Sequence, residues 1–305
     1  MPAIPPEEGA AGRLVTLGRV GYDGPHAEGA ARLLGQPKRL AVLAYILVAQ
    51  REGIVSRDRV VGMFWPESDE VRARNALRQT VSFIRAALGR DVVESVGLHA
   101  LRISSALACD AVHFEWLLDE GRREEALGAY GGEFLPGLHV PGSVGFTSWV
   151  EARRAQFGHR AAKAAWDLSA AREAAGDAGG AAFWGKRALA LSPFSESEVQ
   201  RLLRLLTRLG DFGGALRAYR GLKDALEEEL GVVPSPETLQ LVSDAMTRAA
   251  ARGERLTALD APRRFNVDRR VAERRQSQRE WRGAERRRGD RRVGERRSGT
   301  DRRAR

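Results

Sequence analysis

The sequence has a single cysteine, Cys109, in 305 residues, and this scarcity narrows the possible chemistry. One thiol cannot form an internal disulfide framework or a cysteine-based zinc cluster. Because apolar residues flank it, we interpret Cys109 as a buried structural thiol. Long apolar runs are missing too, so no stretch of about 18 residues could span a bilayer, and the first residues lack the basic and apolar regions of a secretory signal. We expect a cytoplasmic protein with no membrane partner.

Catalytic motifs are equally scarce. No Walker phosphate loop occurs, and no glycine-rich dinucleotide motif follows a strand. The histidines show no metal-ligand spacing. The sequence therefore predicts no enzyme, no cofactor and no metal site. The histidines are His26, His99, His113, His139 and His159.

The positive charge is distributed unevenly. The chain has a formal net charge of +10, yet residues 262–305 alone have 18 arginines, no lysine and a net charge of +11. Residues 12–107 have a net charge of +5, and residues 108–261 one of −4. Because cationic side chains release counterions from phosphates, the first and last regions are candidates for contact with a polyanion.

Residues 13–107 have the element order of a winged helix-turn-helix domain. Pro37 is suited to the first turn of a helix, Ser56 is suited to cap the next helix, and Pro66 ends it. Two strand-like runs flank Gly97 and predict a hairpin. After a disordered start at 1–12, we predict a strand at 13–20, a turn at 21–24, helices at 37–50, 57–65 and 70–88, and strands at 91–96 and 98–104.

From residue 108 to residue 250 the sequence is helical almost without interruption. Gly176-Asp177 recurs as Gly210-Asp211 after 34 residues, which is the tetratricopeptide period. An alanine follows five positions after each glycine, and Gly121 begins a related phrase. Small residues at fixed positions let paired helices pack closely. We predict a mainly α protein, in which an N-terminal winged helix-turn-helix domain (α+β) precedes an all-α, tetratricopeptide-like repeat domain. Its helices are expected at 111–120, 122–130 and 148–174, and around residues 188, 203, 222 and 241.

The helix at 70–88 carries the candidate DNA-binding side chains. Leu77, Val81, Ile84 and Leu88 share one face at helical spacing. Arginine can bind guanine, and asparagine or glutamine can bind adenine, through paired hydrogen bonds. The opposite face is therefore suited to the major groove, although a solvated surface helix would have similar residues. It consists of Arg72, Asn75, Arg78, Gln79, Ser82 and Arg85.

Roles within this set follow from residue type. We expect Arg78, Gln79 and Asn75 to contact bases. On this helix, Arg72, Arg74 and Arg85 are expected to contact phosphates. Near the starts of other helices, where backbone N–H groups also bind anions, lie Lys38, Arg39, Arg57 and Arg59, each of which could contact a phosphate or simply serve solubility. His99 and Arg102 lie on the predicted wing and could reach the minor groove or the backbone.

Residues 251–305 are predicted to be a disordered, arginine-rich tail. Six acidic residues in this tail are each followed by two arginines, and the few apolar residues cannot form a core. The tail could bind nucleic acid or an anionic surface, or it could be a self-neutralising polyampholyte that aids solubility.

Several phrases together resemble the SARP-type bacterial transcriptional regulators. The segment 40–89, with Trp65-Pro66 and 74–79, is similar to the winged helix of that family. The phrases at 132–137, 149–153 and 229–237 resemble its bacterial transcriptional activator domain (BTAD). The resemblance implies binding to promoter DNA, side-by-side protomers on direct repeats, recruitment of RNA polymerase and association with the nucleoid. Two departures stand out: residues 24–36 are less strand-like than the family pattern, which predicts a reduced N-terminal sheet, and Leu98-His99-Ala100-Leu101 replaces the usual wing phrase.

We therefore predict a sequence-specific DNA-binding regulator, with the activator role implied by the resemblance. Its helical domain would mediate contacts with another protomer, polymerase or a signal. One alternative is a helical-repeat adaptor without sequence-specific DNA binding, attached to nucleic acid by its tail. Another is an RNA- or membrane-surface protein led by that tail.

Deletion of residues 262–305 should lower affinity for all DNA sequences alike and flatten its salt dependence, because the deletion removes a net charge of +11. The measurement is a gel-shift titration at several salt concentrations with the full and the shortened chain. An unchanged salt slope would assign the tail a different role.

Overall fold

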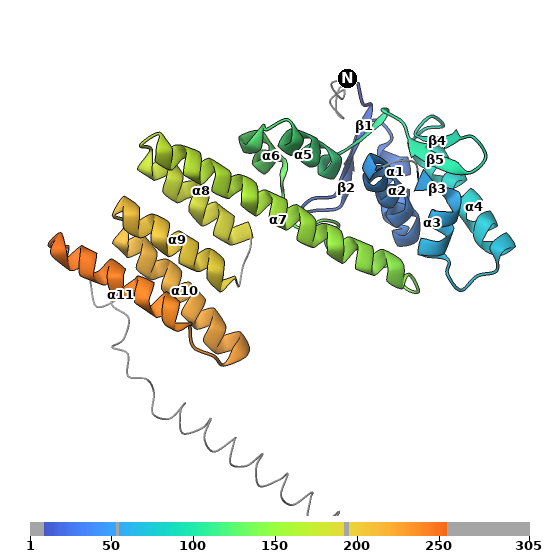
Figure 1. Cartoon of the computed structure of the whole chain (residues 1–305). Helices are drawn as coiled ribbons and strands as arrows, with labels where there is room; N and C mark the ends of the chain where they lie inside the picture. Colours follow the sequence, from blue (N-terminus) through green and yellow to red (C-terminus); the bar gives the residue numbers. More distant parts are fainter. Residues whose placement is uncertain (1–8, 53–54, 192–194, 255–305) are drawn as a thin grey trace, which may run out of the picture. The chain divides into compact units, whose positions relative to one another are not determined.

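The computed structural model describes residues 9–52, 55–191 and 195–254 (Figure 1). It divides at Gly210 into two compact units, and each is described by itself. Most of the predicted arginine-rich tail lies outside the described residues. In the described part, the architecture is the predicted one: a small α+β domain followed by a series of helices.

The described residues of the first domain form two three-stranded sheets and four α-helices. One sheet has the strand order β2-β1-β6, with β2 antiparallel and β6 parallel to β1. The other has the order β3-β5-β4 and is antiparallel throughout. The elements are β1 (Gly12–Val15), β2 (Gly21–Asp23), α1 (Ala27–Leu34), α2 (Pro37–Ala49), a 3-10 turn (Gln50–Glu52), β3 (Val55–Ser56), α3 (Arg57–Phe64), α4 (Glu70–Leu88), β4 (Val93–Val96), β5 (Ala100–Ile103) and β6 (Leu107–Cys109).

Four parts of this domain differ from the prediction, and one of them is the two-residue strand β3, which had no predicted element. The strand expected at 13–20 ends at Val15, and the turn expected at 21–24 is strand β2, because Arg13 pairs with Asp23 and the chain reverses between the two strands. The segment after β2 forms α1, which had no predicted element. Strand β6 was not predicted either, because its pairing with β1 joins residues more than 90 positions apart.

Helix α2 forms the centre of the first domain. Every residue from Leu40 to Ala49 is buried, so this helix is covered on all sides and shows no polar face. Helix α1 packs closely on α4 at Gly29, where a Cβ atom would lie 2.0 Å from the carbonyl oxygen of Ala87. A glycine is therefore required at this crossing.

The helical region follows the prediction closely. The first unit contains α5 (Asp110–Asp119), α6 (Arg123–Ala129), α7 (Val144–Ala174), α8 (Ala178–Leu191) and α9 (Glu196–Leu209), and the second contains α10 (Phe212–Leu230) and α11 (Pro236–Ala251). In the second unit, Phe212 packs in a core with Ala245 and Ala249.

The repeated Gly-Asp pairs have the same local geometry. Gly176 and Gly210 both have positive φ angles, of +77° and +81°. The side chains of Asp177 and Asp211 accept hydrogen bonds from the amides three residues on, at 2.8 and 2.7 Å. The alanine five positions after each glycine is fully buried, as is its counterpart in the earlier phrase: Ala181, Ala215 and Ala126. These observations confirm the predicted repeats. They also explain why glycine, aspartate and alanine recur at these positions.

A short segment between α6 and α7 attaches the helical region to the first sheet. The amide of Gly18 donates to the carbonyl of Glu133 at 2.9 Å, and the amide of Leu135 donates to the carbonyl of Thr16 at 2.7 Å. The guanidinium of Arg154 on α7 donates to the carbonyls of Phe134 and Leu135. This segment contains the predicted BTAD phrase at 132–137, which therefore has a structural role.

The carboxylate of Asp110, at the start of α5, is buried beneath β1. It accepts hydrogen bonds from the amide of Thr16 at 2.8 and 2.9 Å, from the hydroxyl of Thr16 at 2.5 Å and from the amide of Leu17 at 2.9 Å. It also accepts one from the amide of Ala111. Because buried carboxylates are costly unless they are fully hydrogen-bonded, this set of donors makes the burial possible.

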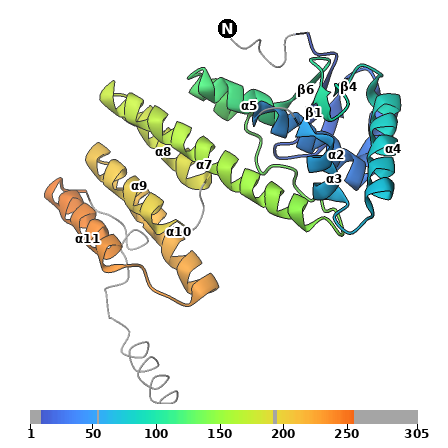
Figure 2. The same cartoon turned by 45° about the vertical axis from the view of Figure 1, so that its right-hand side comes forward.

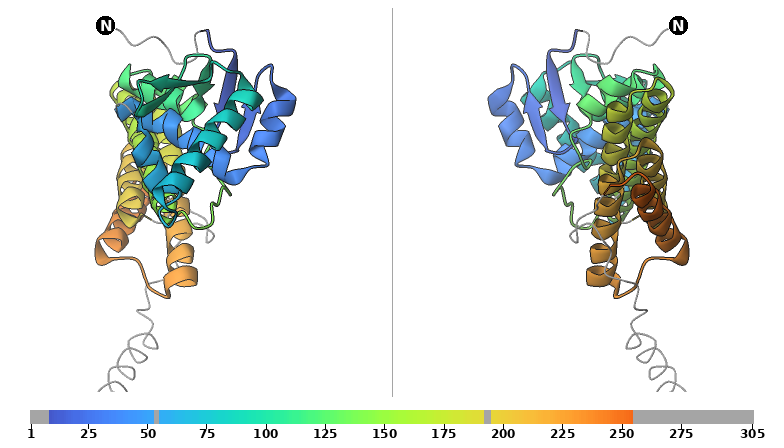
Figure 3. Two further views of the ribbon diagram at one scale, coloured as in Figure 1. Left: turned by 90° about the vertical axis from the view of Figure 1, so that its right-hand side faces the viewer. Right: turned by 90° about the vertical axis from the view of Figure 1, so that its left-hand side faces the viewer.

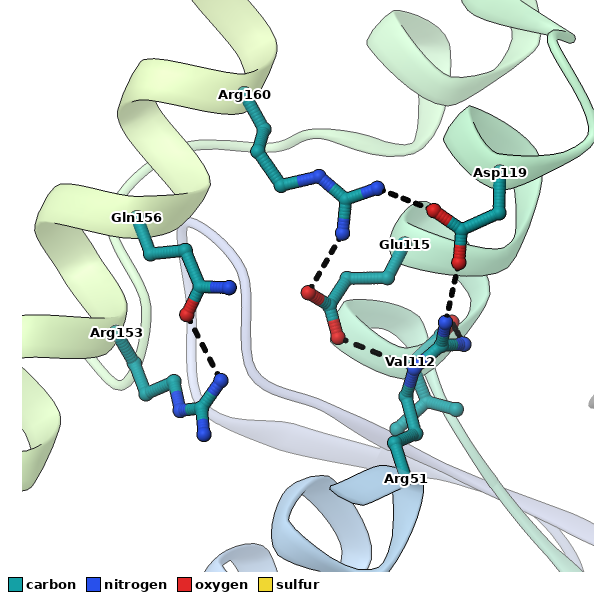
Figure 4. Close-up of polar contacts among 7 residues, drawn as sticks. All are labelled: Arg51, Val112, Glu115, Asp119, Arg153, Gln156 and Arg160. Carbon is teal, nitrogen blue, oxygen red and sulfur yellow. Dashed lines mark hydrogen bonds and ion pairs between the residues drawn. The ribbon is translucent and has the colours of Figure 1, made fainter.

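A second polar cluster joins the first domain to α5 and α7 (Figure 4). Arg51, which follows α2, contacts Glu115 at 3.3 Å and Asp119 at 2.6 Å. Arg160 on α7 contacts the same two carboxylates, at 2.8 and 2.5 Å. Two arginines and two acids thus form a charge-balanced network across three elements.

Aromatic side chains reinforce this junction. Tyr45 on α2 and Phe64 at the end of α3 meet Trp149 and Phe146 on α7, with ring centroids 4.9 Å apart for Tyr45–Trp149 and 5.0 Å apart for Phe64–Phe146. The rings of Phe146 and Phe64 are fully buried. The winged helix and the start of the helical region therefore share one apolar core.

Replacing Asp110 by alanine should destabilise the first unit strongly. The change leaves the buried amides of Thr16 and Leu17 without an acceptor, and each loss costs about 1–3 kcal/mol. We expect the free energy of unfolding to fall by about 3 kcal/mol or more, measured by urea denaturation with far-UV circular dichroism. The control is Asp91→Ala, an exposed acid, which should change it by less than about 0.5 kcal/mol. Equal effects of the two changes would contradict this account.

Candidate nucleic-acid interface

Helix α4 begins and ends where the sequence predicts. The side chain of Asp69 caps its start by accepting from the amide of Arg72 at 2.9 Å, and Gly89 ends it with a φ of +114°. The predicted apolar face is buried. Buried residues on α4 are Ala73, Leu77, Thr80, Val81, Ile84, Ala87 and Leu88.

The predicted polar face of α4 is exposed along most of its length. The helix lies on the side of the first unit away from α8 (Figures 1 and 2), and the left view of Figure 3 faces that side. Asn75 and Gln79, on which the base-contact hypothesis depends, are both exposed. The exposed predicted residues are Arg72, Arg74, Asn75, Arg78, Gln79 and Ser82.

Carboxylates partly neutralise the first half of this face. Arg72 forms an ion pair with Asp69 at 3.0 Å, and Arg74 contacts Glu70 at 2.8 Å and Asp58 on α3 at 3.3 Å. These partners were not predicted from the sequence. The spacings of three and four residues could have revealed two of them, whereas the contact with Asp58 depends on how α3 and α4 pack.

In the middle of α4, the arginine side chain contacts a neutral group and not a carboxylate. Arg78 donates a hydrogen bond of 3.0 Å to the side-chain oxygen of Asn75. Among the described residues, Arg78 has no ion pair with an acidic side chain. The positive charge of Arg78 is therefore available to a ligand beside the amide groups of Asn75 and Gln79.

Arg85 differs from its prediction. It is half-buried, and its Nε and Nη2 atoms donate to the backbone carbonyl of Val93 at 2.9 and 2.7 Å. The helical wheel placed Arg85 on the exposed face because it cannot anticipate β4, which covers the last turn of α4. Arg85 thus lies between the helix and the wing.

Arg57, the first residue of α3, joins the same region. Its Nη2 atom donates to the hydroxyl of Ser95 on β4 at 2.9 Å, and its amide donates to the carbonyl of His99 at 2.8 Å. Burial, followed by the nearby positive charges of Arg85 and Arg78, lowers the pKa of Arg57. Arg57 therefore lies close enough to Arg85 and to Arg78 to be repelled by both.

The predicted wing is the β4–β5 hairpin. Gly97, with a φ of +59°, begins its turn, and the next residues, Leu98 and His99, are exposed. Arg102 faces Glu94 in the hairpin register and forms an ion pair with it. His99 is thus placed to contact a ligand, while Arg102 is neutralised within the hairpin.

The other predicted cations lie on aromatic rings. The ammonium of Lys38 lies 5.1 Å from the ring of Trp65, and burial lowers the pKa of Lys38. The guanidinium of Arg39 lies 4.0 Å from the ring of Phe83 on α4, and that of Arg59 lies 5.9 Å from the ring of Tyr45. Such stacking stabilises the domain and still leaves a cation available to a phosphate.

Cys109 is buried, as predicted, with 1% of its surface exposed. Burial, followed by the negative charge of Asp110, raises its pKa to about 12. At neutral pH its thiol is protonated and inaccessible, so it is not suited to act as a nucleophile. Within the described ranges, no cluster of three potential metal ligands occurs and no helix could cross a membrane.

The chain is similar to known transcriptional regulators. The family profile of the bacterial transcriptional activator domain matches residues 118–244. The transcriptional regulatory protein MoaR1 of Mycobacterium tuberculosis is 28% identical over 220 residues, covering 67% of this chain and 70% of MoaR1. MoaR1 of Mycobacterium bovis has the same identity over the same length.

A solved structure supports the fold. The structure described as Mycobacterium tuberculosis EmbR in complex with low affinity phosphopeptide matches with a TM-score of 0.50 and 23% sequence identity. The match covers 81% of this chain and 67% of that chain. The chain therefore contains a bacterial transcriptional activator domain and, in its predicted phrases and its similarity to MoaR1, resembles the SARP-type bacterial transcriptional regulators.

Proposed function

We propose that the protein is a sequence-specific transcriptional activator that places α4 in the major groove of promoter DNA. The observation that carries this proposal is the exposed row of Asn75, Arg78 and Gln79 on a helix whose opposite face is buried. A helix of this kind, presented after α3 by a winged helix-turn-helix scaffold, fits the width of the groove.

The three side chains have the donors and acceptors that base edges require. Arg78 can donate two hydrogen bonds to guanine, and the amide groups of Asn75 and Gln79 can each bind adenine in the same paired manner. The bond from Arg78 to Asn75 orders both side chains before DNA arrives. This ordering lowers the entropy lost on binding.

Phosphate contacts would be strongest where arginines lack acidic partners. Arg72, Arg74 and Arg102 are bound to carboxylates, which a phosphate must displace. Arg57 and Arg78 contact neutral oxygens and keep their full charge for a ligand. We therefore assign the stronger phosphate attraction to the region where α3 begins and α4 passes β4. Lys38 and His99 would contribute at its margins.

The helical region would supply the protein contacts. We propose domain limits of 13–107 for the winged helix, 108–250 for the BTAD and 251–305 for the tail. The BTAD belongs to a family of transcriptional activator domains, and its region has a net negative charge, which disfavours DNA as its partner. Phe183 on α8 is 59% exposed and adds apolar surface for a protein contact. RNA polymerase and a second protomer on DNA are the partners we propose for this region.

The double change Arg78→Ala and Gln79→Ala should remove most of the sequence preference. Each paired contact is worth about 1–3 kcal/mol of discrimination, so the ratio of specific to non-specific affinity should fall by a factor of about 30 or more. The measurement is a gel-shift titration, with a site selected from random DNA and with unrelated DNA of the same length. Circular dichroism should show the same helix content as the unchanged protein.

The matched control makes the same two substitutions elsewhere. Arg32 and Gln36 are exposed and lie outside α4, so Arg32→Ala with Gln36→Ala should keep the preference. Full preference in the α4 variant, or an equal loss in the control, would refute the assignment of α4 as the base-contacting helix.

A further inference from the structure

The first strand of the wing is an edge strand. In the order β3-β5-β4, β5 is the only strand among the described residues that pairs with β4, and no described strand lies at the other edge of β4. The rest of the wing is attached more firmly: β5 also pairs with β3, and the amide of Ile103 donates to the side chain of Gln50 at 2.8 Å. An edge strand leaves carbonyl and amide groups without ladder partners. The position of β4 therefore depends on contacts from side chains.

Arg85 provides the main contact of this kind from α4. Two of its nitrogen atoms, Nε and Nη2, share the carbonyl oxygen of Val93 at the start of β4. Hydrogen bonds from a charged donor are stronger than neutral ones, and a planar guanidinium fixes direction as well as distance. This pair of bonds joins the last turn of α4 to the first residue of the wing.

Arg57 provides a second contact two residues along the same strand. It binds the hydroxyl of Ser95, and its backbone amide binds the carbonyl of His99 at the tip of the hairpin. Residues two apart on a strand are separated by about 6.6 Å. Two guanidinium groups of like charge are thus held on one short strand by neutral acceptors.

We propose that Arg85, with support from Arg57, is a positioning residue that sets the angle between α4 and the wing. This role explains why the last arginine of α4 is half-buried and bound to a carbonyl, whereas Arg72 and Arg78 on the same helix are exposed. Its functional part rests on the proposed function. The wing tip, where Leu98 is 85% exposed, would then meet DNA at a fixed place relative to α4.

A role in positioning and a role in binding phosphate give opposite results for two substitutions. Lysine keeps the charge of Arg85 but cannot form the two bonds to Val93, and glutamine keeps neither. If Arg85 positions the wing, Arg85→Lys and Arg85→Gln should weaken specific binding to a similar extent, by about tenfold, with an unchanged salt slope. If Arg85 binds phosphate, the Arg85→Lys variant should keep the affinity for DNA. The Arg85→Gln variant should then reduce the slope of log affinity against log salt concentration by about 0.9.

The coupling can also be measured without DNA, by amide hydrogen exchange in the free, full-length protein. Both variants should exchange about tenfold faster at the amides of 93–103, while the amides of α2 stay as protected as in the unchanged protein. Retained protection of α2 shows that the domain is folded. The control is Arg90→Gln, which removes an exposed arginine just after α4 and should leave exchange in the hairpin unchanged.

Unchanged exchange at 93–103 in both Arg85 variants would overturn the proposal, as would rescue of affinity and salt slope by lysine. If the proposed function itself is wrong, the experiments give a different result. In that case the unchanged protein shows no sequence preference in the gel shift, while the exchange experiment still decides whether Arg85 fixes the wing.

Discussion

A single buried carboxylate makes the arrangement of the first unit possible. Asp110 is the first residue of α5, and its oxygens accept from the amides of Thr16 and Leu17, where β1 ends. Without an acceptor these amides would be unsatisfied in the interior, and without the donors the carboxylate could not be buried. The chain therefore enters the helical region at one defined point of the first sheet.

The close approach of two backbone segments also restricts how the helical region meets the first sheet. A Cβ atom on Gly18 would lie 2.3 Å from the carbonyl oxygen of Gly131, so glycine is needed where the segment before α7 meets β1. The network of Arg51, Glu115, Asp119 and Arg160 then fixes α2, α5 and α7 together. One core and one polar network therefore join the winged helix to α5 and α7.

The sequence could predict the elements that depend on local patterns. Periodicity and capping residues located α4 with its observed bounds, and the Gly-Asp repeat located the turns before α8 and α10. Elements that depend on distant partners were not predictable in this way. Strand β6 has three residues and exists because β1 lies beside it. Asp110 had the pattern of an ordinary first helical residue, and its role depends on amides more than 90 positions away.

The same distinction applies to the candidate interface. Helical periodicity identified the exposed side chains of α4 apart from Arg85, because for the others exposure follows from spacing along the helix. It could not identify their charge partners, because Asp58 reaches Arg74 from another helix and Val93 reaches Arg85 from the wing. These partners change the chemistry. Exposed ion pairs are weak in water, so a phosphate can displace the carboxylate from Arg72 or Arg74, although rehydrating the carboxylate reduces the gain. An arginine bound to a carbonyl keeps its net charge, but its guanidinium group is held in one orientation. The number of arginines on the helix therefore overstates the number that can respond to DNA in the same way.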